Sequence, residues 1–170
     1  GSGTMASQAI PYNTQANLTA NAFTRTGYSF TGWNTQANGL GTQYLNQALY
    51  TIGGADVNLY AQWQKNTYTL TFNKNLGTGT TVTQNLLYAT STPLSANTYI
   101  RTGYNFDGWN TQSNGLGTSY ADKANYSIGA ANATLYAKWT PLTISIAFDE
   151  EGGTTTSPET IYRDYNTAYG

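Results

Sequence analysis

Short stretches in which apolar and polar side chains alternate dominate this chain. Residues 68–72 read Tyr-Thr-Leu-Thr-Phe, and residues 134–139 place Leu135, Ala137 and Trp139 on one side. Alternation with a period of two residues is typical of a strand that has one buried face. The pattern therefore predicts strands at 68–72, 80–89, 104–111 and 134–139.

Segments rich in Asn and Gly separate these stretches. Residues 73–79 form such a segment, so we expect the strands on either side of it to pair as a hairpin. Gly108 interrupts the alternation just before Trp109 and indicates a bulge. We expect a connector at 93–100, where the pattern leaves a single helical turn open, and the pattern at 120–128 leaves a short helix and a loop open.

The chain is built from an internal repeat. Residues 25–63 and 101–139 align without a gap at an offset of 76 residues and are identical at 25 of 39 positions. The most distinctive shared residues are Arg25 and Arg101, Gly27 and Gly103, Tyr28 and Tyr104, Trp33 and Trp109, and Trp63 and Trp139. Such self-similarity indicates tandem units that share one architecture.

The repeat also predicts the limits of the units. Ile144-Ser-Ile-Ala-Phe148 corresponds to the strand at 68–72, so a third copy starts there. We predict a first unit at 1–64 that lacks its opening strand, a complete unit at 65–140, and the opening hairpin of a third unit at 141–170. A shifted phase, with units at 1–75 and 77–151 and a remainder, stays open.

Composition removes several classes of function. The 170 residues include 7 basic and 8 acidic side chains and no His or Cys. The chain therefore lacks the residues for a Ser-His-Asp or Cys-His nucleophile and for a thiolate-imidazole zinc site. Its near-neutral charge argues against nucleic-acid binding, and it has no apolar run of about 18 residues for membrane insertion. We expect no cofactor.

The recurring residues resemble a known family. The run Arg-Thr-Gly-Tyr-x-Phe-x-Gly-Trp-Asn-Thr-x-x-Asn-Gly, with Leu-Tyr-Ala-x-Trp further along, is similar to the Listeria–Bacteroides repeat. That family includes the B repeat of internalin-type surface proteins. The resemblance implies a β-rich α+β fold of tandem small β-grasp (ubiquitin-like) modules, with mixed sheets and little helix. It also implies an extracellular or bacterial cell-surface location, a role in adhesion or spacing, and no enzymatic activity.

Two motifs have alternative interpretations. Trp33, Trp63, Trp109 and Trp139 are expected to fill the cores of small units, although exposed rings would instead form a platform for sugars. Arg25 and Arg101 are expected to clamp backbone carbonyls or to stack on a neighbouring Tyr, as an alternative to anchoring a ligand carboxylate. Gly27 and Gly103 are expected in turns that need a positive φ.

The acidic residues do not predict a metal site. Asp149, Glu150 and Glu151 form the densest cluster, and a calcium loop is the alternative that they raise. The corresponding residues 73–77 are Asn-Lys-Asn-Leu-Gly, however, and a metal that the fold requires would have ligands in both copies. No Lys recurs between the copies either, which argues against an internal isopeptide cross-link.

The unequal ends of the repeat suggest assembly. Ile144, Ile146 and Phe148 lie on a strand that is available to pair with the edge that the first unit leaves open, which would give fibres by strand addition. The expected partners are neighbouring repeats or other copies of the chain. The rival interpretation is a module that binds a glycan or a host protein through the loops at 34–42 and 110–118.

Overall fold

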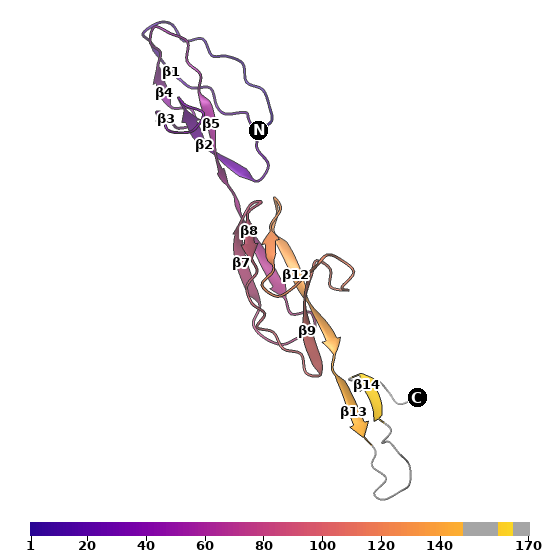
Figure 1. The fold of residues 1–170 in the computed structure, drawn as a ribbon. Helices are drawn as coiled ribbons and strands as arrows, with labels where there is room; N and C mark the ends of the chain where they lie inside the picture. The colour runs from indigo at the N-terminus through magenta and orange to yellow at the C-terminus, as the bar shows by residue number, and fades with distance from the viewer. Residues whose placement is uncertain (148–159, 165–170) are drawn as a thin grey trace, which may run out of the picture. The chain divides into compact units, whose positions relative to one another are not determined.

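The chain folds into two compact units built from β-strands. The computed structural model describes residues 1–147 and the backbone of residues 160–164, and these contain no helix (Figure 1). The first unit comprises Gly1–Tyr68 with Leu86–Thr90 and Ser127–Ala131, and the second comprises Thr69–Asn85, Ser91–Tyr126 and the chain from Asn132 onward.

The first unit contains a three-stranded antiparallel sheet. Its order is β3-β2-β5, with β2 at Tyr28–Asn34, β3 at Gln43–Tyr44 and β5 at Tyr60–Lys65. A separate pair joins β1 (Gln15–Asn17) to β4 (Leu49–Thr51). In this sheet β5 is an edge strand, which pairs with β2 on one side and with no other strand of the sheet.

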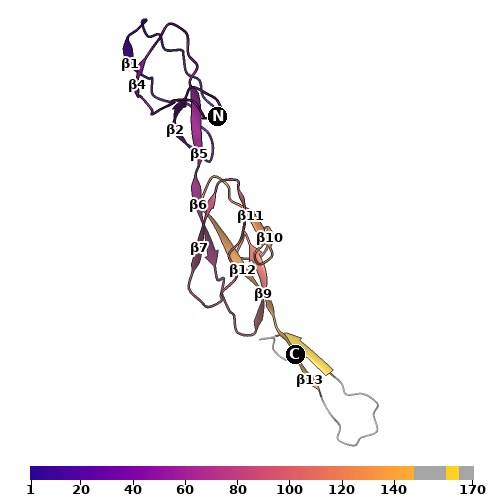
Figure 2. The ribbon, with the colours of Figure 1, turned by 60° about the vertical axis from the view of Figure 1, so that its left-hand side comes forward.

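The second unit is organised around a five-stranded mixed sheet. Its order is β10-β9-β12-β6-β7, which can be followed in Figure 2. The strands are β6 (Thr67–Asn73), β7 (Val82–Leu87), β9 (Tyr104–Asn110), β10 (Ser119–Tyr120) and β12 (Ala133–Pro141). Strand β12 pairs antiparallel with β9 and parallel with β6, so β6 lies between β12 and β7.

Two further strand pairs complete the described structure. Strand β8 (Ser91–Pro93) pairs with β11 (Asn125–Ser127), and β13 (Thr143–Ala147) pairs antiparallel with β14 (Thr160–Asp164). Ile144 and Ile146 on β13 are 58% and 44% exposed. Phe148, the third residue expected to take part in strand addition, lies outside the described residues.

The predicted strands at 68–72, 104–111 and 134–139 correspond to β6, β9 and β12. The predicted strand at 80–89 corresponds to β7, which ends at Leu87 because Ala89 has a φ of 46° and the amide of Thr90 bonds to the carbonyl of Leu87 in a turn. Gly108 has a φ of 106°, and the register of β9 against β12 shifts there, as expected for a bulge.

The described residues are all β, which confirms the expected β-rich fold, but the helix that an α+β fold would add is absent from them. At 93–100 no helical turn forms, because the Asn97 side chain bonds to the amide and the carbonyl of Tyr99 and the amide of Leu94 bonds to Ala124. At 120–128 the chain contributes to β10 and β11 instead of a helix. These local side-chain bonds satisfy backbone groups that a helix would otherwise pair.

Each unit has its own apolar interior. In the second unit Leu70, Phe72, Trp109, Leu135 and Ala137 are each at most 1% exposed. In the first unit the buried cluster around Trp33 is smaller, with Leu18, Trp33 and Tyr50 exposed at 8%, 6% and 9%. This cluster is therefore less completely closed than the one around Trp109.

Candidate functional site

Trp33 and Trp109 occupy corresponding places at the centres of the two units. The Trp33 ring lies 5.0 Å from Phe30 and 6.1 Å from Phe23, measured between ring centroids. Trp109 has the same surroundings, with Phe106 at 5.0 Å and Tyr99 at 6.0 Å. Edge-to-face contacts of this kind stabilise buried aromatic clusters. Both rings face the interior and do not form an exposed platform.

Trp63 and Trp139 lie nearer the surface. Each is half-buried and packs edge to face on the Phe of its unit, at 5.6 Å from Phe30 and 5.6 Å from Phe106. The indole Nε1 of Trp139 donates to the carbonyl of Lys74 at 3.0 Å, so this ring also holds the turn after β6.

The recurring Arg residues stack on the recurring Tyr residues. The Arg25 guanidinium lies 3.9 Å from the centre of the Tyr28 ring, and Arg101 lies 3.6 Å from that of Tyr104. Gly27 and Gly103, between them in the sequence, have φ values of 76° and 77°. The left-handed backbone at these glycines lets each Arg fold back over its Tyr.

A tyrosine outside the motif packs against Gly27 within the first unit. The ring of Tyr88 lies against Tyr28 at 5.7 Å, and a Cβ added at Gly27 would overlap the Tyr88 ring. The amide of Tyr88 also donates to the carbonyl of Asn66. Gly27 therefore serves close packing as well as the turn.

The loops at 34–42 and 110–118 are shaped by a buried Asn that sequence reasoning did not single out. The Asn110 side chain is 1% exposed and bonds to the backbone at Gln112, Gly115 and Gly117. Asn34 bonds in the same way to the residues at the corresponding positions of its own loop. The sequence signal that could have identified Asn34 and Asn110 is that this Asn occurs at the same position in both copies. At the loop tips, Leu40 and Leu116 are each 82% exposed.

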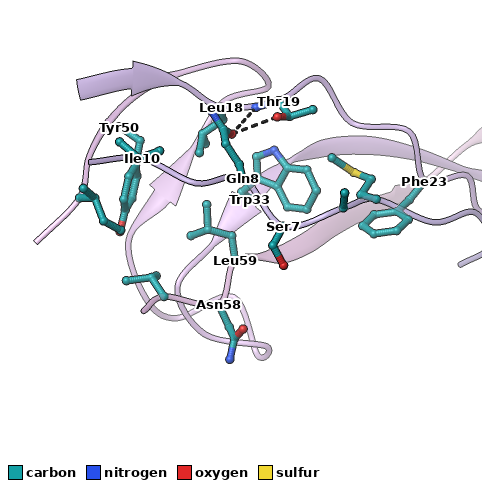
Figure 3. A pocket seen from close by; sticks show the side chains of 14 residues that line it. Ser7, Gln8, Ile10, Leu18, Thr19, Phe23, Trp33, Tyr50, Asn58 and Leu59 are labelled. Carbon is teal, nitrogen blue, oxygen red and sulfur yellow. Dashed lines mark hydrogen bonds between the residues drawn. The ribbon is translucent and has the colours of Figure 1, made fainter. Parts of the chain in front are cut away.

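The first unit contains a cleft of about 330 Å³ with a mixed polar and apolar lining (Figure 3). We call it the first-unit cleft, and its lining residues include Gln8, Ile10, Leu18, Trp33, Val57 and Leu59. One wall is the segment 5–10 and the other is the segment 57–59. The Gln8 side chain fixes the first wall, because its oxygen accepts from the amide and hydroxyl of Thr19 at 2.8 and 3.0 Å (Figure 3).

The described residues do not gather groups for metal binding. None of them belongs to a cluster of three or more His, Cys, Asp or Glu side chains that would hold an ion. The cluster of Asp149, Glu150 and Glu151 lies outside the described range. Burial, with a contribution from Tyr120, raises the pKa of Tyr126 above its usual value.

Comparison with known proteins relates both copies of the motif to one family. Residues 1–62 and 68–138 each match the profile of the Listeria-Bacteroides repeat domain. No solved structure gives a significant match to the chain.

The curated relatives are much longer proteins. A protein of Evansella cellulosilytica, named as a Gly-rich membrane protein, is 35% identical over 151 residues, which cover 85% of this chain and 17% of that protein. Internalin H of Listeria monocytogenes is 36% identical over 119 residues, or 69% of this chain and 20% of that protein. The chain thus spans about a fifth of the length of the relatives that it matches. Among the described residues no helix has the length and hydrophobicity to cross a membrane.

Proposed function

Because the chain belongs to the Listeria-Bacteroides repeat family, we propose that it is a non-catalytic structural segment of a bacterial cell-surface or extracellular protein. In this role its tandem units form a stalk or fibre that spaces or presents adhesive parts of a longer protein. The names of the relatives, an internalin and a membrane protein, support a place in the cell envelope.

The observation that carries this proposal is the position of the recurring Trp residues. Trp33 and Trp109 are 6% and 1% exposed and are surrounded by other rings, so the most distinctive part of the motif builds unit interiors. A residue that fills a core recurs because every unit needs a core. A residue that binds a ligand would instead have to be accessible.

We also propose that the units are β-grasp modules whose complete form runs from 65 to 140. The pairing of β6 with β12 supports this phase over the shifted one, because the strand at 68–72 then opens the second unit and does not close the first. In this arrangement an opening strand follows directly on the closing strand of the preceding unit, as β6 follows β5 and β13 follows β12.

Strand addition is the proposed mode of assembly. The first sheet ends at β5, whereas its counterpart β12 in the second unit has β6 on its far side. In a fibre, a neighbouring unit or a second copy would supply the missing strand, and β13 with its exposed Ile144 and Ile146 is the candidate donor.

A binding module is the second candidate function, and one observation favours it. The loops at 34–42 and 110–118 are held in shape by Asn34 and Asn110 and present an exposed Leu at each tip. A pre-shaped loop with an apolar tip is suited to recognition of a host protein or a glycan.

A binding survey distinguishes the two candidates. The soluble chain, fluorescently labelled, is applied to a glycan array and to host cells beside a double variant Leu40→Asp, Leu116→Asp. The structural role predicts equal background binding of both proteins. Saturable binding that the double variant loses would contradict it and would favour the binding module.

A further inference from the structure

The chain enters and leaves the sheet of the second unit through two strands that lie side by side. It enters through β6 and leaves through β12, and the two are neighbours in the five-stranded sheet, neither of them at an edge (Figure 2). They run parallel, with Ala133 opposite Leu70 and Tyr136 opposite Asn73. Because parallel neighbours point the same way, a pull on the chain before β6 and a pull on the chain after β12 act in opposite directions along one ladder.

This direction of pull loads the ladder between β6 and β12 in shear. In shear the hydrogen bonds between the two strands carry the load together, so that none of them breaks alone. A pull on the same end of both strands would instead open the ladder one bond at a time. Since a single backbone hydrogen bond adds little net stability, the number of bonds that are loaded together decides how well the strands resist force.

Side-chain hydrogen bonds continue the contact beyond both ends of the ladder. Before the first paired position, the amide of Thr69 donates to the side-chain oxygen of Asn132 at 2.8 Å. After the last one, the side-chain nitrogen of Asn75 donates to the carbonyl of Ala137 at 2.9 Å. The bond from the Trp139 indole to the turn after β6 lies at this same end. The two segments are therefore bonded to each other along their whole length.

The segments 69–75 and 132–139, which we call the β6–β12 clamp, also bury apolar side chains. Leu70 and Phe72 on β6 and Leu135 on β12 are each at most 1% exposed. If the strands slid past each other, these side chains would leave their close-packed positions and meet water. Sliding is therefore opposed by packing as well as by hydrogen bonds.

A buried tyrosine fastens β6 to the strand on its other side. The Tyr99 hydroxyl donates to the carbonyl of Phe72 at 2.7 Å and accepts from the amide of Val82, the first residue of β7, at 2.9 Å. The Tyr99 side chain is 3% exposed, so water does not compete for these bonds. Strand β6 is thus held by β12 on one side and by β7 on the other.

We propose that the β6–β12 clamp is a mechanical element that keeps the second unit folded while the chain is under tension. The function that it adds is resistance to force, because a stretched chain loads the clamp along its strands, the direction in which its bonds act together. This inference rests on the proposed role as a stalk, which supplies the tension. The dependence of the resistance on the direction of pull is a property of the second unit alone.

Single-molecule force spectroscopy on the full chain tests the clamp. The chain has no Cys of its own, so pairs of introduced Cys residues define where the force acts. The shear pair is Gln64→Cys with Thr140→Cys, before β6 and near the end of β12. The opening pair is Gln64→Cys with Ala131→Cys, which pulls on the same end of both strands. All three positions are exposed, and urea unfolding of both double variants checks that they share the stability of the parent.

We expect the shear pair to need about two- to fourfold more force than the opening pair at the same pulling rate. The reason is that four paired positions share the load in shear, whereas they carry it one after another on opening. Forced unfolding is governed by the unfolding rate, so two pulls on one fold compare two barriers at equal stability. Equal forces, or a higher force for the opening pair, would overturn the proposal.

A first single variant tests the far end of the clamp. Asn75→Gly removes the side-chain bonds to Ala137 and Ser113, and Gly suits the positive φ of 43° at this position. The opening pull reaches this end last. The variant should therefore lower the shear force and leave the opening force unchanged. An equal fall of both forces, or no fall of the shear force, would contradict the clamp.

A second single variant tests the near end. Asn132→Ala removes the bond to the amide of Thr69, which both pulls load from the start, so both forces should fall. Leu116→Ala is the control, and with its side chain 82% exposed on a loop tip it should change neither force. Unchanged forces in Asn132→Ala would show that this bond is not part of the clamp.

The outcomes separate this inference from the proposed function. A force that depends on direction, together with saturable glycan binding in the survey above, would support the clamp and refute the purely structural role. Equal forces in the two directions, together with background binding in the survey, would refute the clamp and leave the stalk role standing.

Discussion

At the scale of single residues, the same side chains do the same work in both copies of the motif. Trp33 and Trp109 fill interiors, Asn34 and Asn110 shape loops, and the Arg residues stack on Tyr. The sequence alone predicted the first of these, because large apolar rings are an efficient filling for a small core. It offered the third only beside a clamp on backbone carbonyls and a ligand anchor, since Arg is suited to all three. It did not predict the Asn bonds, since Asn is also abundant in ordinary turns.

Trp109→Ala should destabilise the second unit by about 3–5 kcal/mol, because removal of a fully buried indole leaves a large cavity. Urea unfolding at 25 °C measures the change in the free energy of unfolding. Leu116→Ala is the control, and with its side chain 82% exposed it should stay within about 0.5 kcal/mol of the parent. A loss below about 1 kcal/mol for Trp109→Ala would show that this ring is not a core residue.

Gly27→Ala should cost about 1–3 kcal/mol, because Ala tolerates a φ of 76° poorly and its Cβ would displace the Tyr88 ring. The same unfolding measurement applies, and the near-ultraviolet circular dichroism of the aromatic rings should change with it. Gly53→Ala is the matched control, since a Cβ there has no heavy atom within 4 Å. Similar stabilities of the two variants would contradict the packing role of Gly27.

At the scale of elements, the longer strands were predictable and the shorter ones were not. Alternation over five or more residues marked β6, β9 and β12. Strands β8 and β11 are three residues each, too short to show a period, and they form where two irregular segments meet. The helical turn that the pattern left open at 93–100 does not form, because the Asn97 side chain bonds to the amide and the carbonyl of Tyr99.

The first-unit cleft could not be predicted from the sequence, because its shape depends on contacts between residues that are far apart in the chain. The absence of an opening strand in the first unit was expected from the repeat. Whether the walls would collapse onto each other, however, depends on packing between residues far apart in the chain, such as Leu18 and Leu59. The Gln8 side chain bonds to the amide and hydroxyl of Thr19 and so ties the segment 5–10 to the chain near Leu18.

Hydrogen exchange gives a prediction at the scale of one strand. The amides at 57–59 should exchange much faster than those at 133–135, because β6 pairs with the latter and β5 begins only at Tyr60. Exchange of the full chain into D2O, followed by NMR, compares the two segments in one sample. Equal protection of both segments would mean that the wall at 57–59 already has a strand partner.

At the scale of the whole molecule, the chain repeats one kind of unit, and its described residues hold no cluster of three or more His, Cys, Asp or Glu side chains. Its family and its relatives place it among repeat-bearing proteins that are several times longer. For tandem repeats, stability is approximately the sum of the units and their nearest-neighbour terms.

The recurring Trp residues are held to be core residues of the units. Exchange of their indole N–H protons with D2O, measured by NMR on the full chain, tests this. The account predicts that Trp109 exchanges slowest and Trp33 next, both much more slowly than the half-buried Trp63, with Trp33 accelerated by the cleft beside it. Exchange of Trp33 and Trp109 at the rate of free indole would place both rings in open solvent and would contradict the structural role.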